Sequence, residues 1–239
     1  DVYVTGETMH DLHYKTLLET TVKGIGWNTS VDRENSNRTG RGIAVAIKST
    51  TTPSTSKAEI RLESDGCCTL LVSTVELGQG SKIVLSQIAA DALGIPLERI
   101  RTVDPDTGVT PFDAATNSSR STYSMGNALR RASDALKLRL AEMAADVLLV
   151  GIDELVVKNG EITVLEQPDV TMSWGDALAL SGLEHLVGSA DYTTGGGLNP
   201  ETLQGIGSVH WHQGVGAAVV EVDEKTGRVV VKRFHAGTY

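Results

Sequence analysis

The residues best placed to do chemistry are Gly78, Gln79, Gly80 and Ser81, which follow a β-rich run and open a helical pattern. A strand, a glycine turn and a helix N-terminus leave backbone N–H groups unpaired, and such groups bind anions, phosphate above all. Glycine lets the main chain approach a ligand closely, and a glutamine amide both donates and accepts hydrogen bonds. A tight strand-to-helix turn without a ligand explains this glycine turn equally well.

A second polar segment precedes the next helical pattern. Residues 116–122, the hydroxyl run, combine several hydroxyl side chains with one arginine. Hydroxyls and a guanidinium at a helix N-terminus favour binding of an anion or a heterocycle. An N-cap on the following helix is the alternative, but a cap needs only one hydroxyl. We therefore expect ligand contacts from Thr116, Ser118, Ser119, Arg120 and Ser121. We also expect this run to lie within contact distance of the glycine turn, because ligands gather where strand ends and helix N-termini converge.

Several segments, in one order along the whole chain, resemble the molybdenum hydroxylases. This group contains the xanthine dehydrogenases, aldehyde oxidases and carbon monoxide dehydrogenases, and the likeness is to the large, molybdopterin-binding subunit. The main segments are VELGQG at 75–80, QIAADALGIP at 87–96, SRST at 119–122 and MGNA at 125–128. Further support comes from RGIA at 41–44, TTPS at 51–54, GAAVVEVD at 216–223 and TGRV at 226–229.

The resemblance implies an oxidoreductase that hydroxylates an aldehyde, a purine or an N-heterocycle with oxygen from water. It implies molybdopterin, expected as the cytosine dinucleotide, with 2Fe-2S clusters and FAD on partner domains or subunits and a homodimer of the complete enzyme. Gln79 would contact the cofactor, the helix N-termini would bind its phosphates, and Ser118 would form a small wall near the metal. No protein ligand to the metal is expected. The catalytic glutamate is expected beyond Tyr239, so this fragment itself would hold no catalytic residue.

A binding module is the second hypothesis: the same fold could hold a pterin nucleotide, or serve in assembly, without turnover. The parent gene would discriminate, because a Gly-x-Gly-Glu segment downstream favours the enzyme and a stop codon near Tyr239 favours the module.

Composition fits a cytoplasmic globular domain rather than a nucleic-acid or membrane protein. The 239 residues carry a net charge of −9 and are 40% hydrophobic, with no apolar run as long as the ~18 residues of a membrane span. Cys67 and Cys68 are adjacent and cannot supply a zinc or iron–sulfur set. The two histidine pairs, at 10 and 13 and at 210 and 212, lack a third ligand, so no protein-bound metal is expected.

The expected elements alternate without a strict βαβ rhythm, which predicts an α+β fold of mixed β-sheets with helices packed on one face. The resemblance specifies the molybdenum cofactor-binding domain type, truncated at both ends. Helices are expected at 9–22, from 81 onward, at 123–150 and, capped by Ser173, up to 180; strands at 42–49, 57–63, 67–76, 99–103, 155–158, 161–164, 209–222 and 228–234. Three segments are predicted: 1–40, an N-terminal helix and polar connector; 41–150, an α/β subdomain with both candidate segments; and 151–239, the start of a second α/β subdomain.

Overall fold

The computed structural model describes residues 2–30 and 38–239 and divides into two compact units. The terminal unit contains residues 1–52 and 196–239, and the central unit contains residues 53–195. This grouping differs from the three segments predicted along the chain, because the late strand at 211–222 returns to pair with the early strand at 38–49. Part of the predicted polar connector, residues 31–37, lies outside the described residues.

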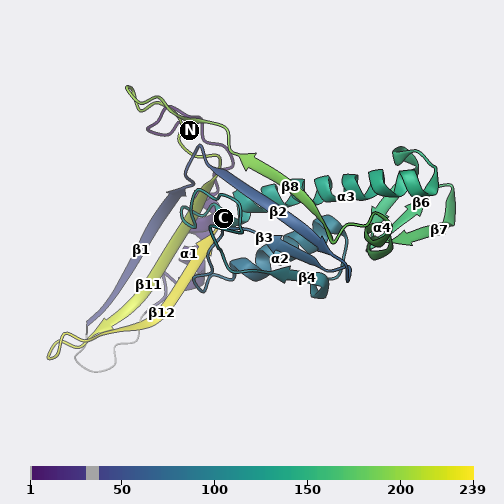
Figure 1. The fold of residues 1–239 in the computed structure, drawn as a ribbon. Helices are drawn as coiled ribbons and strands as arrows, with labels where there is room; N and C mark the ends of the chain where they lie inside the picture. The colour runs from purple at the N-terminus through teal and green to yellow at the C-terminus, as the bar shows by residue number, and fades with distance from the viewer. Residues whose placement is uncertain (1, 31–37) are drawn as a thin grey trace. The chain divides into compact units, whose positions relative to one another are not determined.

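Within the described residues, the terminal unit contains a three-stranded antiparallel sheet with one helix, and a short two-stranded sheet at 197–198 and 205–206 (Figure 1). The larger sheet has the strand order β1-β11-β12, and helix α1 packs on β11 and β12 over a small core of Ile25, Ala217 and Val219. The elements are α1 Tyr14–Ile25, β1 Arg38–Ser49, β9 Gly197–Leu198, β10 Gly205–Ile206, β11 Trp211–Val222 and β12 Val229–Thr238. Alternate residues of β11 are buried, as expected for a strand with one face covered.

Helix α1 begins later than predicted. The apolar pattern from Met9 predicted a helix over 9–22, but the structure forms one only from Tyr14. The side chain of Gln213 explains the delay, since its oxygen accepts from the His13 amide at 2.7 Å and its nitrogen donates to the Asp11 carbonyl at 2.8 Å. A long-range contact thus satisfies backbone groups that a helix would otherwise use.

The central unit contains the predicted mixed sheet with helices on one face (Figure 1). The strand order is β4-β3-β2-β8, in which β3 and β4 are parallel and the other pairs are antiparallel. The elements are β2 Thr55–Glu63, β3 Cys68–Leu71, α2 Ser81–Leu93, η1 Leu97–Arg99, β4 Ile100–Thr102, η2 Ser121–Met125, α3 Gly126–Leu148 and β8 His185–Thr193. Helix α3 packs on β2 and β8, α2 packs on α3, and the buried alternate residues of β2 contribute to the core beneath them. The predicted fold class is confirmed.

A second sheet completes the central unit. It contains β5 Leu155–Lys158, β6 Glu161–Val164 and β7 Gln167–Ser173, preceded by η3 Ile152–Glu154 and followed by α4 Trp174–Leu180. The hairpin predicted at Asn159 and Gly160 is confirmed, and both residues have positive φ as a tight two-residue turn requires. The predicted cap of α4 is also confirmed, because Ser173 Oγ accepts from the Asp176 amide at 3.0 Å. Strands β7 and β8 were not predicted.

Helix α3 lies very close to β8 at one glycine. A Cβ on Gly188 would stand 2.4 Å from the Ala132 carbonyl oxygen and 2.5 Å from the Leu136 Cβ. Only glycine permits this approach, which sets the distance between the long helix and the sheet. The segment of α3 around Ala132 and Leu136 is thereby fixed relative to β8.

Within the described residues, no helix has the length and apolar character needed to cross a membrane.

Candidate functional site

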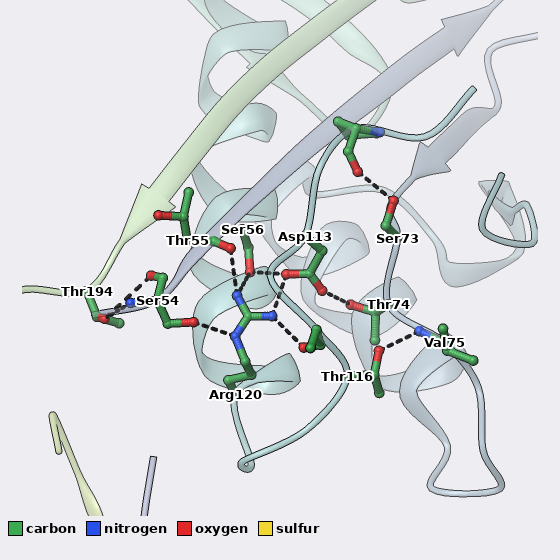
Figure 2. A network of polar contacts seen from close by, with 12 residues as sticks. Ser54, Thr55, Ser56, Ser73, Thr74, Val75, Asp113, Thr116, Arg120 and Thr194 are labelled. Carbon is green, nitrogen blue, oxygen red and sulfur yellow. Dashed lines mark hydrogen bonds and ion pairs between the residues drawn. The ribbon is translucent and has the colours of Figure 1, made fainter. Parts of the chain in front are cut away.

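Strand β3 ends at Leu71, earlier than the predicted Glu76, because the following residues bind a loop instead of a neighbouring strand. Ser73 Oγ donates to the Pro111 carbonyl at 2.5 Å, and Thr74 Oγ1 donates to Asp113 at 3.4 Å (Figure 2). These side-chain contacts replace a strand ladder. They join the segment before the glycine turn to the loop before the hydroxyl run.

The glycine turn and the hydroxyl run meet at Val75. The Val75 amide donates to Thr116 Oγ1 at 2.8 Å (Figure 2). The Val75 carbonyl accepts from Gln79 Nε2 at the same distance. The two segments are therefore neighbours in the central unit, as their shared position at helix N-termini predicted. The contact runs through the backbone of one intervening residue.

The N-terminus of α2 already holds an anion, the carboxylate of Glu76. One oxygen accepts from the amides of Gly78 and Gly80 at 2.8 and 3.0 Å, and the other accepts from the Lys82 amide and the Ser81 hydroxyl at 3.1 and 3.2 Å. These bonds lower the pKa of Glu76 to about 2, with the Lys82 and Gly80 amides as the main causes. The expectation that these N–H groups are free for a phosphate is wrong.

Gln79 is exposed, but its side-chain amide folds back onto its own turn. Its oxygen accepts from the Leu77 amide at 2.5 Å, and its nitrogen donates to the Val75 carbonyl and to Ser81 Oγ at 3.2 Å. The side chain therefore shapes the turn. Its own backbone N–H makes no hydrogen bond within the described part of the chain and remains available.

Arg120 is a buried structural residue rather than an anion ligand. It is 1% exposed, and each of its five N–H groups has a protein partner (Figure 2). The partners are Ser54 Oγ, Asp113 Oδ1, the Ala115 and Thr55 carbonyls and Ser56 Oγ, all between 2.5 and 2.7 Å. A guanidinium has five N–H donors and no more, so the expected ligand contact from Arg120 is excluded in this conformation.

The rest of the hydroxyl run has an unusual backbone. Ser118 and Ser119 have φ of 50° and 54°, which non-glycine residues seldom adopt, and η2 at Ser121–Met125 is a short π-helix. Both features are frequent at functional sites, and both persist only where the surrounding structure stabilises them. Here the Arg120 network supplies that support. Arg120, which follows at φ −94°, uses its backbone N–H on the Asn117 carbonyl at 3.1 Å.

Uncommitted donors are found in this run and at the Gln79 backbone N–H. Neither the amides nor the hydroxyls of Ser119 and Ser121 form a hydrogen bond within the described residues, and Ser119 is exposed. The Thr116 hydroxyl accepts from the Val75 amide, and this bond leaves its own O–H as a donor. These free donors fit a polar ligand with phosphate or pterin oxygens, so the arrangement is compatible with a molybdopterin. Gly78, Gly80 and Ser81 shape the turn together with Glu76.

Two important residues escaped the sequence analysis, Glu76 and Asp113. The signal for Glu76 was an acidic side chain in the turn that leads to a helix start, where a carboxylate binds orphan amides. Asp113 carried no such local signal, because its partner Arg120 becomes visible only through the ion pair at 2.5 Å, with both side chains 1% exposed. Elsewhere, Asp104 pairs with Lys82 at 2.5 Å and Asp106 caps its own turn, and no three His, Cys, Asp or Glu side chains cluster within the described ranges.

Comparison with known proteins places the chain in a family. Residues 21–237 match the molybdopterin cofactor-binding domain. The chain is 29% identical over 192 residues to the putative xanthine dehydrogenase molybdenum-binding subunit of Escherichia coli K12, covering 76% of this chain and 25% of that protein. It is 28% identical over 186 residues to the carbon monoxide dehydrogenase large chain of Hydrogenophaga pseudoflava, covering 74% and 22%.

Solved structures show the same fold. The aldehyde oxidoreductase of Desulfovibrio gigas aligns with a TM-score of 0.68 at 22% identity, covering 94% of this chain and 22% of that one. Quinoline 2-oxidoreductase of Pseudomonas putida 86 aligns at 0.63 with 20% identity, covering 93% and 28%. The chain spans about a quarter of the length of these curated relatives. Because the match extends over nearly all of its residues, this chain belongs to the molybdopterin cofactor-binding domain family of the molybdenum hydroxylases.

Proposed function

We propose that this chain forms part of the cofactor site in the molybdopterin-binding subunit of a molybdenum hydroxylase. The complete enzyme would oxidise an aldehyde, a purine or an N-heterocycle with oxygen from water. The observation that carries the proposal is the meeting of the glycine turn and the hydroxyl run at Val75, bound by Thr116 on one side and Gln79 on the other. Two segments proposed to contact one ligand must be neighbours, and these are.

Within the site, the unpaired backbone N–H of Gln79 would bind polar groups of the cofactor. The unpaired N–H and hydroxyl groups of Ser119 and Ser121 would do the same. Ser118 would line the site as a small side chain, and Thr116 would hold the turn against the run. The bound cofactor supplies the redox chemistry, and the protein supplies position and electrostatics. Arg120 serves this arrangement indirectly, because it fixes the strained run through Asp113 and the 54–56 segment.

The finer details follow from the family. We propose the cytosine dinucleotide form of the cofactor, 2Fe-2S and FAD groups on partner domains or subunits, a homodimer of the complete enzyme and a cytoplasmic location. The catalytic glutamate would lie outside these residues. One relative is named a carbon monoxide dehydrogenase large chain, and another a putative xanthine dehydrogenase molybdenum-binding subunit.

The test is the molybdenum and nucleotide content of the purified full-length protein. We expect bound molybdenum and a released cytidine nucleotide in the wild type, and a severalfold lower content in Gln79→Ala. Gln87→Ala is the matched control, because Gln87 is an exposed residue of α2 whose side chain makes no hydrogen bond within the described residues. Wild-type protein without molybdenum or a pterin would contradict the proposal.

A further inference from the structure

Glu76 encloses the start of α2 with both of its carboxylate oxygens. Each oxygen accepts two hydrogen bonds: one from the amides of Gly78 and Gly80, the other from the Ser81 hydroxyl and the Lys82 amide, all between 2.8 and 3.2 Å. Charged acceptors at a helix N-terminus also gain from the helix dipole. The donors come from four of the five residues that follow Leu77, so one side chain organises the whole turn.

Gln79 lies between the two glycine amides that Glu76 binds. Gly78 and Gly80 have φ of 94° and 78°, a conformation that glycine adopts freely but does not by itself prefer to others. Fixing the amides on both sides of Gln79 restricts the backbone to one arrangement. The Gln79 side chain then reaches the Leu77 amide and the Val75 carbonyl, and its own N–H is left unpaired.

We propose that Glu76 is a positioning residue, which holds the glycine turn so that Gln79 presents its unpaired backbone N–H to the cofactor. This inference rests on the proposed function of the turn. Glu76 touches no ligand in this role. It also excludes a phosphate from the α2 N-terminus, because its carboxylate takes the same donors that a phosphate would use.

The decisive substitution is Glu76→Gln. An amide keeps the shape but offers one acceptor oxygen, so two of the four donors face an NH2 group whichever way the amide is turned. Hydrogen exchange in cofactor-free protein should rise roughly 10- to 100-fold at the amides that face the NH2 group, either Gly78 and Gly80 or Lys82, as expected for lost hydrogen bonds to a charged group. Molybdenum content of the full-length protein should fall severalfold. Glu142→Gln, an exposed position on α3, should change neither quantity.

Each result discriminates. Unchanged exchange at the three amides overturns the inference, and so does faster exchange with full molybdenum content. If Gln79→Ala lowers the molybdenum content and Glu76→Gln does not, the positioning role of Glu76 is contradicted and the proposed function stands. If neither variant lowers the molybdenum content, the proposed role of the glycine turn in cofactor binding is contradicted.

A pH series on the wild type applies if Glu76→Gln does not accumulate. The pKa of Glu76 is lowered from 4.5 to about 2 by its amide partners, so its stabilisation of the turn is complete above about pH 4.5 and is lost as the pH falls toward 2. Exchange at Gly78, Gly80 and Lys82, corrected for the intrinsic rate, should rise over that window ahead of the core amides. A turn that opens only together with the core would overturn the inference.

Discussion

Thr116 and Gln79, 37 residues apart in the sequence by their numbers, bind the amide and the carbonyl of the same residue, Val75, at 2.8 Å each. The pairing fixes the hydroxyl run against the glycine turn by two neutral hydrogen bonds. Each such bond contributes only about 0.5–1.5 kcal/mol, so the junction can be loosened locally without unfolding the domain. It is therefore a place where function and stability can be tested separately.

Thr116→Val should loosen that junction. Valine keeps the side-chain shape but removes the acceptor, which leaves the Val75 amide unpaired. We expect up to about tenfold faster exchange of the Val75 amide, a loss of about 1 kcal/mol or less in global stability, and a lower molybdenum content in the full-length protein. Thr122→Val, at an exposed threonine of the same run, is the control. Equal behaviour of the two variants would argue against a role for Thr116.

Asp113→Ala should destabilise the central unit strongly. It leaves the guanidinium of Arg120 buried at 1% exposure without its countercharge, and breaking a buried ion pair costs about 3–5 kcal/mol. Urea denaturation measures the loss. Asp134→Ala removes an ion pair whose carboxylate is 74% exposed and should change the midpoint very little. A similar small shift for Asp113→Ala would show that water reaches Arg120.

Gly188→Ala should separate α3 from β8. The new methyl group would stand within 2.6 Å of backbone atoms of Ala132 and Leu136, which cannot move without shifting the helix. We expect a loss of about 2–3 kcal/mol in the free energy of unfolding. Gly195→Ala is the matched control, because a Cβ there meets nothing within 4 Å. If the two alanines have equal urea midpoints, the close approach is not a constraint.

Cys68 should resist alkylation at mildly alkaline pH while Cys67 reacts. Burial raises the pKa of the Cys68 thiol to about 12, and the side chain is fully buried in the core, whereas Cys67 is partly exposed. At pH 8.5 fewer than about one in a thousand Cys68 thiols would be ionised, and the thiolate is the reactive form. Iodoacetamide labelling followed by peptide mass spectrometry measures each site, with urea-unfolded protein as the reference. Equal labelling of both cysteines in the native protein would refute the assignment.

The sequence alone was sufficient for the local features. The Asn159-Gly160 hairpin, the Ser173 cap and the start of α2 after the glycine turn all follow from short-range chemistry, in which a residue's own backbone preference or a partner three residues away decides. The family also followed from the sequence, because its motifs occur in order along the whole chain. The proximity of the two candidate segments was predicted from their common position at helix starts, and Val75 joins them.

Only the tertiary structure decided which polar groups are free. From the sequence, Arg120 is a candidate anion ligand, but in the fold its guanidinium is bound by residues 54–56 and by Asp113. The amides at the start of α2 are likewise candidates for a phosphate, but the Glu76 carboxylate binds them. Likewise, Gln213 stops α1 from starting at residue 9, across 200 residues of sequence. A residue's type sets the hydrogen bonds that it can make, but long-range packing determines which partners lie within reach. A buried polar group forms hydrogen bonds with the partners that the fold places beside it.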